Sequence, residues 1–439
     1  MNAAKALSKC SSNTLVEVRL NPSRTDVRQA TANSSEKNTA RRDWDSVWDE
    51  LGLEKGGTGF SCPLESFNES LAQTIASEYA RSVLDVFVQR FAQVFSKNGL
   101  NDCFSNLLHA DLPLELAWSS DLGSLFKATR LGDEDHAIRN AAAFALSAGA
   151  KGFGGEWQLE LSNATKFFWD NWALPVCDKL TVICSDASAS IKLSLGGDQT
   201  QVSFVRGLDG WKCETPARAT RLPSFGSGRH RLVLLPRSAA LDSGVFHDVN
   251  DAALALEIFS PALIEILTQA LDLLEEHLPH YFDWIVRIIR RVAVLHSGRN
   301  VLHSGSPENQ HGTILISDNF RVLSVAEMLI HEASHQYLEL LNKLGPTVDP
   351  GHTKLYYSPV KQCDRPLHKI LLAYHAFANV MLFYRGVAEC GLADLRFEKF
   401  QTVLNDELRQ LEHALLENDA ILPIGRALVE PLIKRSVCQ

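Results

Sequence analysis

The sequence lacks a Cys-x-x-Cys pair, a signal-peptide core and any long apolar run, and each absence excludes a class of protein. Its nine cysteines are scattered and odd in number, so they do not indicate a disulfide framework. They are typical of reduced, mostly structural thiols in the cytoplasm. The N-terminus has no apolar core of the kind that directs secretion. These features predict a cytoplasmic protein.

Positively charged residues are also fewer than negatively charged ones. The 43 lysines and arginines against 52 aspartates and glutamates give a formal net charge of −9, which disfavours attraction of nucleic acid or an anionic membrane by the surface as a whole. The densest apolar stretch, 371–383, contains His375 and Asn379 and is shorter than the roughly 18 residues that a membrane helix needs. We therefore predict no nucleic-acid partner and no membrane partner.

Hydrophobic patterning divides the chain into regions. Residues 1–42 are rich in Ser, Thr and Asn and predict a flexible tail. Residues 43–175 predict helices, because apolar residues such as Tyr79, Val83 and Phe87 recur at helical spacing. Residues 176–245 contain short β-branched runs separated by Gly, Asp and Ser, which predict a small antiparallel sheet.

The last region, 246–439, is predicted to be helical and to carry the catalytic site. Its expected helices span 253–276, 279–294, 321–343, 366–388, 395–417 and 421–436. No internal repeat is apparent, which argues against a solenoid. The predicted fold class is α+β: mostly helical, with a small central antiparallel β-sheet and a helical C-terminal half.

The strongest motif is His-Glu-Ala-Ser-His, which begins at His331 inside the expected helix 321–343. On a helix, His331 and His335 lie one turn apart on the same face and can bind one metal ion. Glu332 lies about 100° further round the helix axis. From there its carboxylate can reach a metal-bound water or a ligand beside the metal. The motif therefore predicts a metal site.

The third metal ligand remains open at this point. A metzincin needs Gly and His where this chain has Leu338 and Leu341, so that class is excluded. A glutamate ligand on a later helix would be Glu389, but the position of its supporting acid holds Ala393. The histidine candidates are His352 in a Gly/Pro loop and two on the next expected helix, His375, which we prefer, and His368. Three imidazoles suit zinc, iron or copper, so ligand type does not separate hydrolysis from oxidation.

The segment 312–377 resembles a known family. It contains "AEMLIHEASHQ" (326–336), "YYSP" (356–359), "DRPL" (364–367) and "HAF" (375–377). These residues are similar to the HExxH-motif proteins encoded beside ribosomal peptide natural products, which are iron(II)/2-oxoglutarate-dependent peptide β-hydroxylases. The chain departs from the family at Val360 and Lys361, where Trp-Arg is usual, and at Leu372, where a histidine is often present.

The resemblance implies a mechanism and roles for several residues. Fe(II) would be held by His331, His335 and His375, with 2-oxoglutarate and O2 as cosubstrates and a precursor peptide as the partner that is hydroxylated at a side-chain β-carbon. The distal carboxylate of 2-oxoglutarate needs a cation, and a guanidinium suits it best. Arg365 is the first candidate and Lys361 the second.

Two further residues are candidates for the site. Tyr357 is a candidate to donate a hydrogen bond to the cosubstrate or to orient the peptide, and Glu332 to position a ligand of the iron. The loop 303–312, before the motif helix, either borders the cleft or is a plain connecting loop.

Two alternatives compete with this interpretation. In a zinc metallopeptidase, Glu332 would act as general base on a zinc-bound water. In a non-catalytic peptide-binding or scaffold protein, the same histidines would hold a structural metal with a fourth protein ligand.

Overall fold

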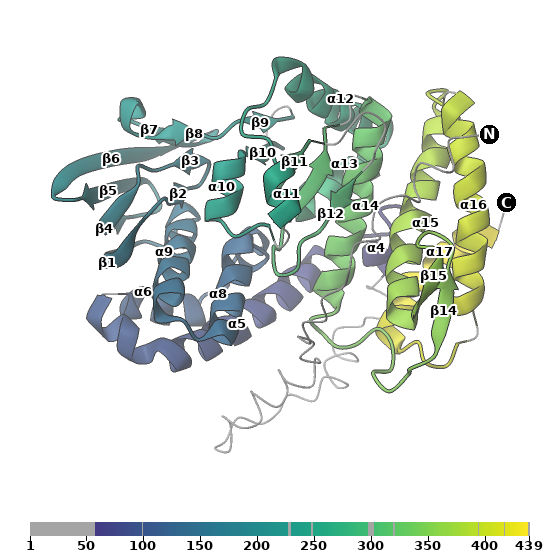
Figure 1. Ribbon diagram of the computed structural model, residues 1–439, viewed down its shortest axis with the longest axis horizontal. Helices are drawn as coiled ribbons and strands as arrows, with labels where there is room; N and C mark the ends of the chain where they lie inside the picture. The colour runs from purple at the N-terminus through teal and green to yellow at the C-terminus, as the bar shows by residue number, and fades with distance from the viewer. Residues whose placement is uncertain are drawn as a thin grey trace. The chain divides into compact units, whose positions relative to one another are not determined.

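The computed structural model describes residues 58–98, 100–226, 230–246, 249–296, 303–318, 321–393, 395–416 and 418–437 (Figure 1). The tail predicted for 1–42 lies outside these residues. The α+β class is confirmed: sheets lie in the middle of the chain and the C-terminal half is mainly helical.

The N-terminal region is a layer of helices whose aromatic residues form a common core. The helices are α5 (Glu69–Asn98), α6 (Asn101–His109), α7 (Leu114–Ala117), α8 (Ser120–Leu131) and α9 (Glu134–Ala150). The short helix α4 (Thr58–Ser61) precedes them in the chain but packs against α14 (Val322–Leu341) and α17 (Pro423–Val437). The apolar stripe predicted from the sequence is buried: Phe87 packs against Phe91 on α5 and against Phe104 on α6. Ser119 caps α8, and Asp133 caps α9 by accepting from the His136 backbone N–H.

The first sheet is antiparallel and has the strand order β1-β4-β5-β6-β7. Its strands are β1 (Gly155–Thr165), β4 (Cys177–Cys184), β5 (Ser188–Leu195), β6 (Asp198–Gly207) and β7 (Gly210–Cys213). Buried and exposed residues alternate along β5, with Ile191 and Leu193 buried, as in a sheet that covers a core with one face. The sheet begins at Gly155, before the boundary predicted at 176. A small sheet of β2 (Phe168–Trp169), β3 (Trp172–Ala173) and β8 (Thr220–Arg221) lies beside it in sequence.

The second five-stranded sheet is mixed, with the order β12-β13-β11-β10-β9. It contains β9 (Ser224–Phe225), β10 (Leu232–Leu235), β11 (Arg291–Leu295), β12 (Ser304–Gly305) and β13 (Thr313–Ser317), of which β10, β11 and β13 are parallel. The sequence predicted a helix to 294, but α13 (Pro279–Ile288) ends earlier and β11 follows. That prediction is wrong at its end because a short apolar run buried on both faces has no periodicity that separates strand from helix.

The first predicted helix of this region also differs from the structure. The expected helix 253–276 is divided into α11 (Val249–Leu254) and α12 (Pro261–His277), and α10 (Arg237–Asp242) precedes them. Ser260 caps α12 by accepting from the Leu263 backbone N–H, and Pro261 occupies the first turn.

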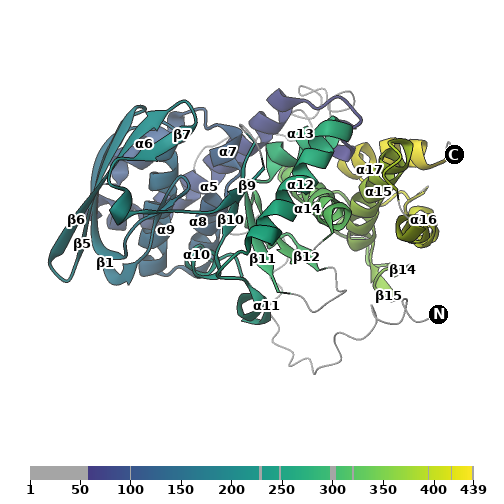
Figure 2. The same cartoon turned by 90° about the horizontal axis from the view of Figure 1, so that it is seen from above.

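The C-terminal region contains the long helices that the sequence predicted. They are α14 (Val322–Leu341), α15 (Leu367–Glu389), α16 (Leu395–Leu415) and α17 (Pro423–Val437), and a hairpin of β14 (Leu355–Ser358) and β15 (Cys363–Pro366) connects α14 to α15. Both views place α14 between the second sheet and α15, and it contacts both (Figures 1 and 2). Among the described residues, α15 is the one helix long and apolar enough to cross a membrane; 67% of its most apolar window is buried inside the protein, which is also typical of a core helix.

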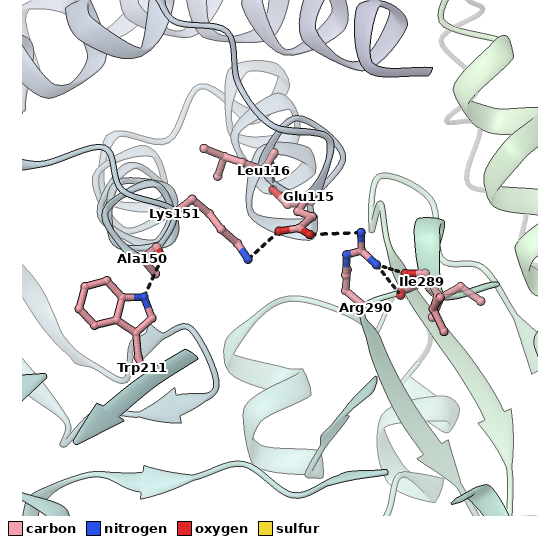
Figure 3. Close-up of polar contacts among 9 residues, drawn as sticks. Glu115, Leu116, Ala150, Lys151, Trp211, Ile289 and Arg290 are labelled. Carbon is pink, nitrogen blue, oxygen red and sulfur yellow. Dashed lines mark hydrogen bonds and ion pairs between the residues drawn. The ribbon is translucent and has the colours of Figure 1, made fainter. Parts of the chain in front are cut away.

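An ionic contact joins the N-terminal helices to the second sheet. Glu115 on α7 lies between Lys151, 2.8 Å away, and Arg290, which is 3.6 Å away and directly precedes β11 (Figure 3). Arg290 also donates to the carbonyl of Val286 at the end of α13. These groups are part-exposed, so we regard the contact as fixing geometry rather than as a large source of stability.

Candidate metal centre

The two motif histidines are already placed as a metal-binding pair. Their Nε2 atoms lie 3.1 Å apart, and their rings meet edge to face with centroids 4.7 Å apart. A metal ion about 2.1 Å from each nitrogen requires the nitrogens to lie roughly 3.0–3.4 Å apart. The helix spacing of His331 and His335 therefore gives a pair of nitrogens whose separation fits one ion.

Both imidazoles are held in the neutral form that binds metals. Burial, the charge of Lys361 and the neighbouring His375 lower the pKa of His331 to about 4. Burial is also the largest cause that lowers the pKa of His335 well below its ordinary value, and Lys369 contributes to it. Neutral imidazoles keep a lone pair for a cation. The Nδ1 atom of His335 is buried and has no hydrogen-bond partner among the described residues, whereas a metal-bound histidine usually donates from its second nitrogen.

Glu332 completes the group that the structure assembles. One ligand atom from each of His331, Glu332 and His335 lies within 4.8 Å of the others. The Glu332 side chain is 1% exposed, and its Oε2 accepts a hydrogen bond of 2.7 Å from the Ser306 hydroxyl. Burial raises the pKa of Glu332 to about 7, although hydrogen bonds from Ser304 and Ser306 oppose the shift. The group fits a metal ion with a carboxylate beside it.

His375 lies outside this group. Its Nε2 is 2.9 Å from the carbonyl oxygen of Ser61 and 3.1 Å from that of Phe60, both in α4. The Asn379 amide donates to the same Ser61 oxygen at 2.8 Å. A ring N–H that donates to carbonyls has no lone pair to offer a metal at that nitrogen. The structure thus brings His331 and His335 together and places His375 against α4.

The packing of α14 against α15 explains this placement. The Phe377 ring lies 4.9 Å from the His331 ring, and Tyr384 is hydrogen-bonded to Glu327, one turn before His331 on α14. The two helices therefore run antiparallel. Helix periodicity puts Ala373 one turn before Phe377, on the side of α15 that faces the motif. His375 lies about 160° round the helix axis from Phe377, yet near enough to α14 to lower the pKa of both motif histidines.

The remaining histidine candidates and Glu389 also lie outside the group. His352 is 3.0 Å from the hydroxyl of Tyr356, and His368 is exposed in the first turn of α15. Glu389 is the last residue of α15 and is exposed.

The predicted cosubstrate residues lie on the β14–β15 hairpin. Lys361 occupies its turn and is near enough to His331 to lower its pKa. Arg365 is half-buried opposite Tyr356 in the hairpin register. Tyr357 pairs with Asp364, is 53% exposed, and points to the other face of the hairpin from Arg365.

Sequence reasoning missed the two serines that contact Glu332. They lie in or beside β12 and come from the loop 303–312, which was expected only to border the cleft or to be a plain connection. The available signal was the pattern Ser304-Gly305-Ser306: alternate residues of a strand point to the same side, so both hydroxyls can reach one carboxylate. The sequence also did not identify Phe377 as the aromatic neighbour of His331.

Comparison of the chain with protein-family models and with curated proteins finds no match to either.

Proposed function

We propose that His331 and His335 hold a catalytic metal beside Glu332, and that the protein is an Fe(II)/2-oxoglutarate-dependent hydroxylase of a peptide side-chain β-carbon. The observation that carries the metal site is the 3.1 Å separation of two neutral imidazole nitrogens. The resemblance of 312–377 to peptide β-hydroxylases supplies the reaction. In that reaction O2 and 2-oxoglutarate give succinate and CO2, and one oxygen atom enters the C–H bond.

The chain's own residues have defined tasks in this proposal. His331 and His335 bind the metal, which supplies the redox chemistry when bound. Lys361, whose charge acts on His331, pairs with a carboxylate of 2-oxoglutarate. Lys369 adds a second positive charge near His335. This arrangement favours Lys361 over Arg365 for that role, although a guanidinium would suit a carboxylate better.

A second function is favoured by the position of Glu332. A carboxylate beside a histidine pair, with a pKa of about 7, is what a zinc metallopeptidase requires of its general base at neutral pH. In that case zinc would be the metal, Glu332 would take a proton from the water that attacks the peptide carbonyl, and the product would be a cleaved peptide.

The first experiment loads the purified protein with Fe(II) in the absence of oxygen and adds 2-oxoglutarate. A weak visible charge-transfer band, lost in His335→Ala and kept in His109→Ala on the exposed end of α6, is the expected result. Absence of the band, with zinc retained through purification, would overturn the hydroxylase proposal in favour of the peptidase.

Two further substitutions test the residues proposed to bind 2-oxoglutarate. They are read out through the charge-transfer band rather than through turnover. Lys361→Ala is expected to raise the 2-oxoglutarate concentration that half-saturates the band by about tenfold. The matched control is Lys354→Ala, because Lys354 is exposed at the base of the same hairpin and lies over the Tyr356 ring. An equal effect of the two substitutions would contradict the role of Lys361. Arg365→Ala tests in the same way the residue that the sequence analysis placed first for binding the distal carboxylate of 2-oxoglutarate.

Glu332→Gln provides the complementary test. In a peptidase it should abolish cleavage while the bound zinc remains, because the metal-binding imidazoles are untouched. In a hydroxylase it should leave the charge-transfer band in place and reduce hydroxylation only in part. Metal content, the band and the mass of the product peptide are measured on the same preparation.

A further inference from the structure

The outer strand of the second sheet lies directly beside the candidate metal group. β12 is the last strand in the sheet order and pairs with β13 alone, through Ser304 with Ile316 and Gly305 with Leu315. It also contacts α14, and Figure 1 shows it next to that helix. The Ser306 hydroxyl that follows the strand donates to Glu332. One sheet edge therefore runs past the residues that would do the chemistry.

Alternate residues of this edge strand direct their backbone N–H and C=O groups away from the sheet. The carbonyl of His303 accepts from the Ser317 backbone N–H at 2.7 Å, and the His303 N–H donates to the Ser317 hydroxyl at 3.2 Å, so residue 303 faces β13. In an antiparallel pair, successive residues alternate between facing the partner strand and facing outward. Gly305 thus faces β13, whereas the N–H and C=O groups of Ser304 and Ser306 face outward, with no backbone partner among the described residues.

The side chains leave one face of the strand open. Ser304 and Ser306 direct their hydroxyls to Glu332. At Gly305, which points to the opposite face, an added Cβ would meet no atom within 4 Å. All three residues are part-exposed. A glycine in an edge strand with free space above it is typical of a place where another backbone approaches closely.

We propose that an extended segment of the peptide substrate adds to β12 as a further strand of the second sheet. Its backbone would bond to the outward N–H and C=O groups of Ser304 and Ser306, which recognise an extended main chain rather than a particular sequence. The residue paired near Ser306 would then lie beside Glu332 and the histidine pair. The choice of a peptide substrate as the occupant rests on the proposed function, because the edge borders the metal group that would modify it.

The test compares two substitutions at one position. Ser304→Pro removes the outward N–H and the hydroxyl, whereas Ser304→Ala removes the hydroxyl alone; proline is tolerated on an edge strand because its missing N–H faces away from the sheet. Each zinc-loaded protein is mixed with a fluorescent library of random peptides of about ten residues. Peptides enriched by the unmodified chain are identified by mass spectrometry and resynthesised.

The expected result is a Kd for the enriched peptides about tenfold higher in Ser304→Pro than in Ser304→Ala. Methylation of alternate backbone nitrogens of the peptide should weaken binding to the unmodified protein, and methylation of the nitrogens between them should not, because a strand pairs through every second residue. This methylation scan tests the proposal even if Ser304→Pro does not fold. Enrichment of no peptide, equal affinities of the two variants, or methylation effects without a two-residue period would overturn it.

Two further outcomes are distinguishable. If Ser304→Pro instead dissociates a dimer in sedimentation, the edge pairs with a second copy of the chain, and the peptide proposal is wrong. If peptides bind with the two-residue period but are neither hydroxylated with Fe(II) and 2-oxoglutarate nor cleaved with zinc, strand addition stands and the proposed function fails.

Discussion

At the scale of single residues, His375 illustrates how the surroundings of an imidazole decide its role. It is completely buried in the middle of α15. Its pKa is lowered to about 4, by burial first, against hydrogen bonds to the carbonyls of Phe60 and Ser61 that raise it. A neutral histidine that donates to two carbonyls links α15 to α4. This contact gives it a structural task whether or not a metal is bound.

We expect His375→Ala to lower the free energy of unfolding by about 2–4 kcal/mol, because it leaves a cavity and removes the donor to the buried Phe60 carbonyl, whereas Asn379 still donates to that of Ser61. Urea unfolding measures the loss, and His109→Ala is the control for an exposed histidine. Metal titration of the same variant tests the ligand role predicted from the sequence. Retention of the bound metal would argue that His375 is not a ligand, whereas loss of metal with unchanged stability would restore it as the third ligand.

His311 is a second buried histidine outside the metal group. Its ring stacks on Trp118 with centroids 3.9 Å apart, and its Nε2 lies 3.1 Å from the Tyr79 hydroxyl. Burial, and then the charge of Lys343, hold the pKa of His311 well below its ordinary value. The residue is therefore neutral in the folded protein, and it takes up a proton only when the chain unfolds.

This difference predicts acid sensitivity. Below a pH of about 6.5 the unfolded chain binds a proton at His311 that the folded chain does not, so stability is lost as the pH falls through and below that value. Between about pH 7 and pH 5 the loss from this residue is up to about 2 kcal/mol. His311→Phe keeps a ring against Trp118 but cannot titrate. Urea unfolding at the two pH values should show a shallower loss in the variant, and an identical loss would contradict the prediction.

At the scale of elements, the position of α14 depends on one buried amide. The Oε1 atom of Gln336 accepts from Trp118 Nε1 at 3.1 Å and from the backbone N–H of Gly312 at 2.9 Å. Gln336 follows His335 directly, so these bonds fix the rotation of the motif helix relative to β13 and to the N-terminal helices. The next residue, Tyr337, makes a separate contact to α13 by stacking on Trp284, with centroids 4.5 Å apart.

Gln336→Met is expected to cost about 2–4 kcal/mol of unfolding free energy, because it keeps the side-chain length but leaves two buried donors without an acceptor. Gln269→Met on the exposed side of α12, where the amide donates to Glu265, should change stability by less than about 0.5 kcal/mol. The measurement is urea unfolding of both variants, together with the metal affinity of each. Equal stabilities would show that the Gln336 bonds do not hold α14.

At the scale of the whole molecule, the N-terminal helices reach the metal region through close backbone packing. A Cβ added at Gly123 on α8 would lie 1.7 Å from the carbonyl oxygen of Asn309, which a side chain cannot occupy. Asn309 belongs to the segment between β12 and β13. Glycine at 123 therefore lets α8 lie directly against the segment that carries Ser306.

Gly123→Ala should destabilise the fold by about 1–3 kcal/mol through overpacking, and it should also weaken metal binding because the segment holding Ser306 must move. Gly155→Ala in β1 is the control, since a Cβ there meets nothing within 4 Å and its φ is not in the left-handed region. Thermal or urea unfolding and a metal titration check both effects. An alanine at 123 that changed neither would contradict the close contact.

The sequence by itself determined the elements whose signals are local. The α+β class, α14 with its two histidines one turn apart, and the apolar helix α15 follow from hydrophobic periodicity and motif spacing, which involve residues close together in the chain. The tertiary structure alone decided which side of α15 meets α14, how the strands of the second sheet pair, and which hydroxyls reach Glu332. These outcomes depend on contacts between residues far apart in sequence, such as His375 with Ser61 and Gln336 with Trp118. The pattern of apolar residues within one helix does not specify such partners, because several faces of a buried helix are equally apolar.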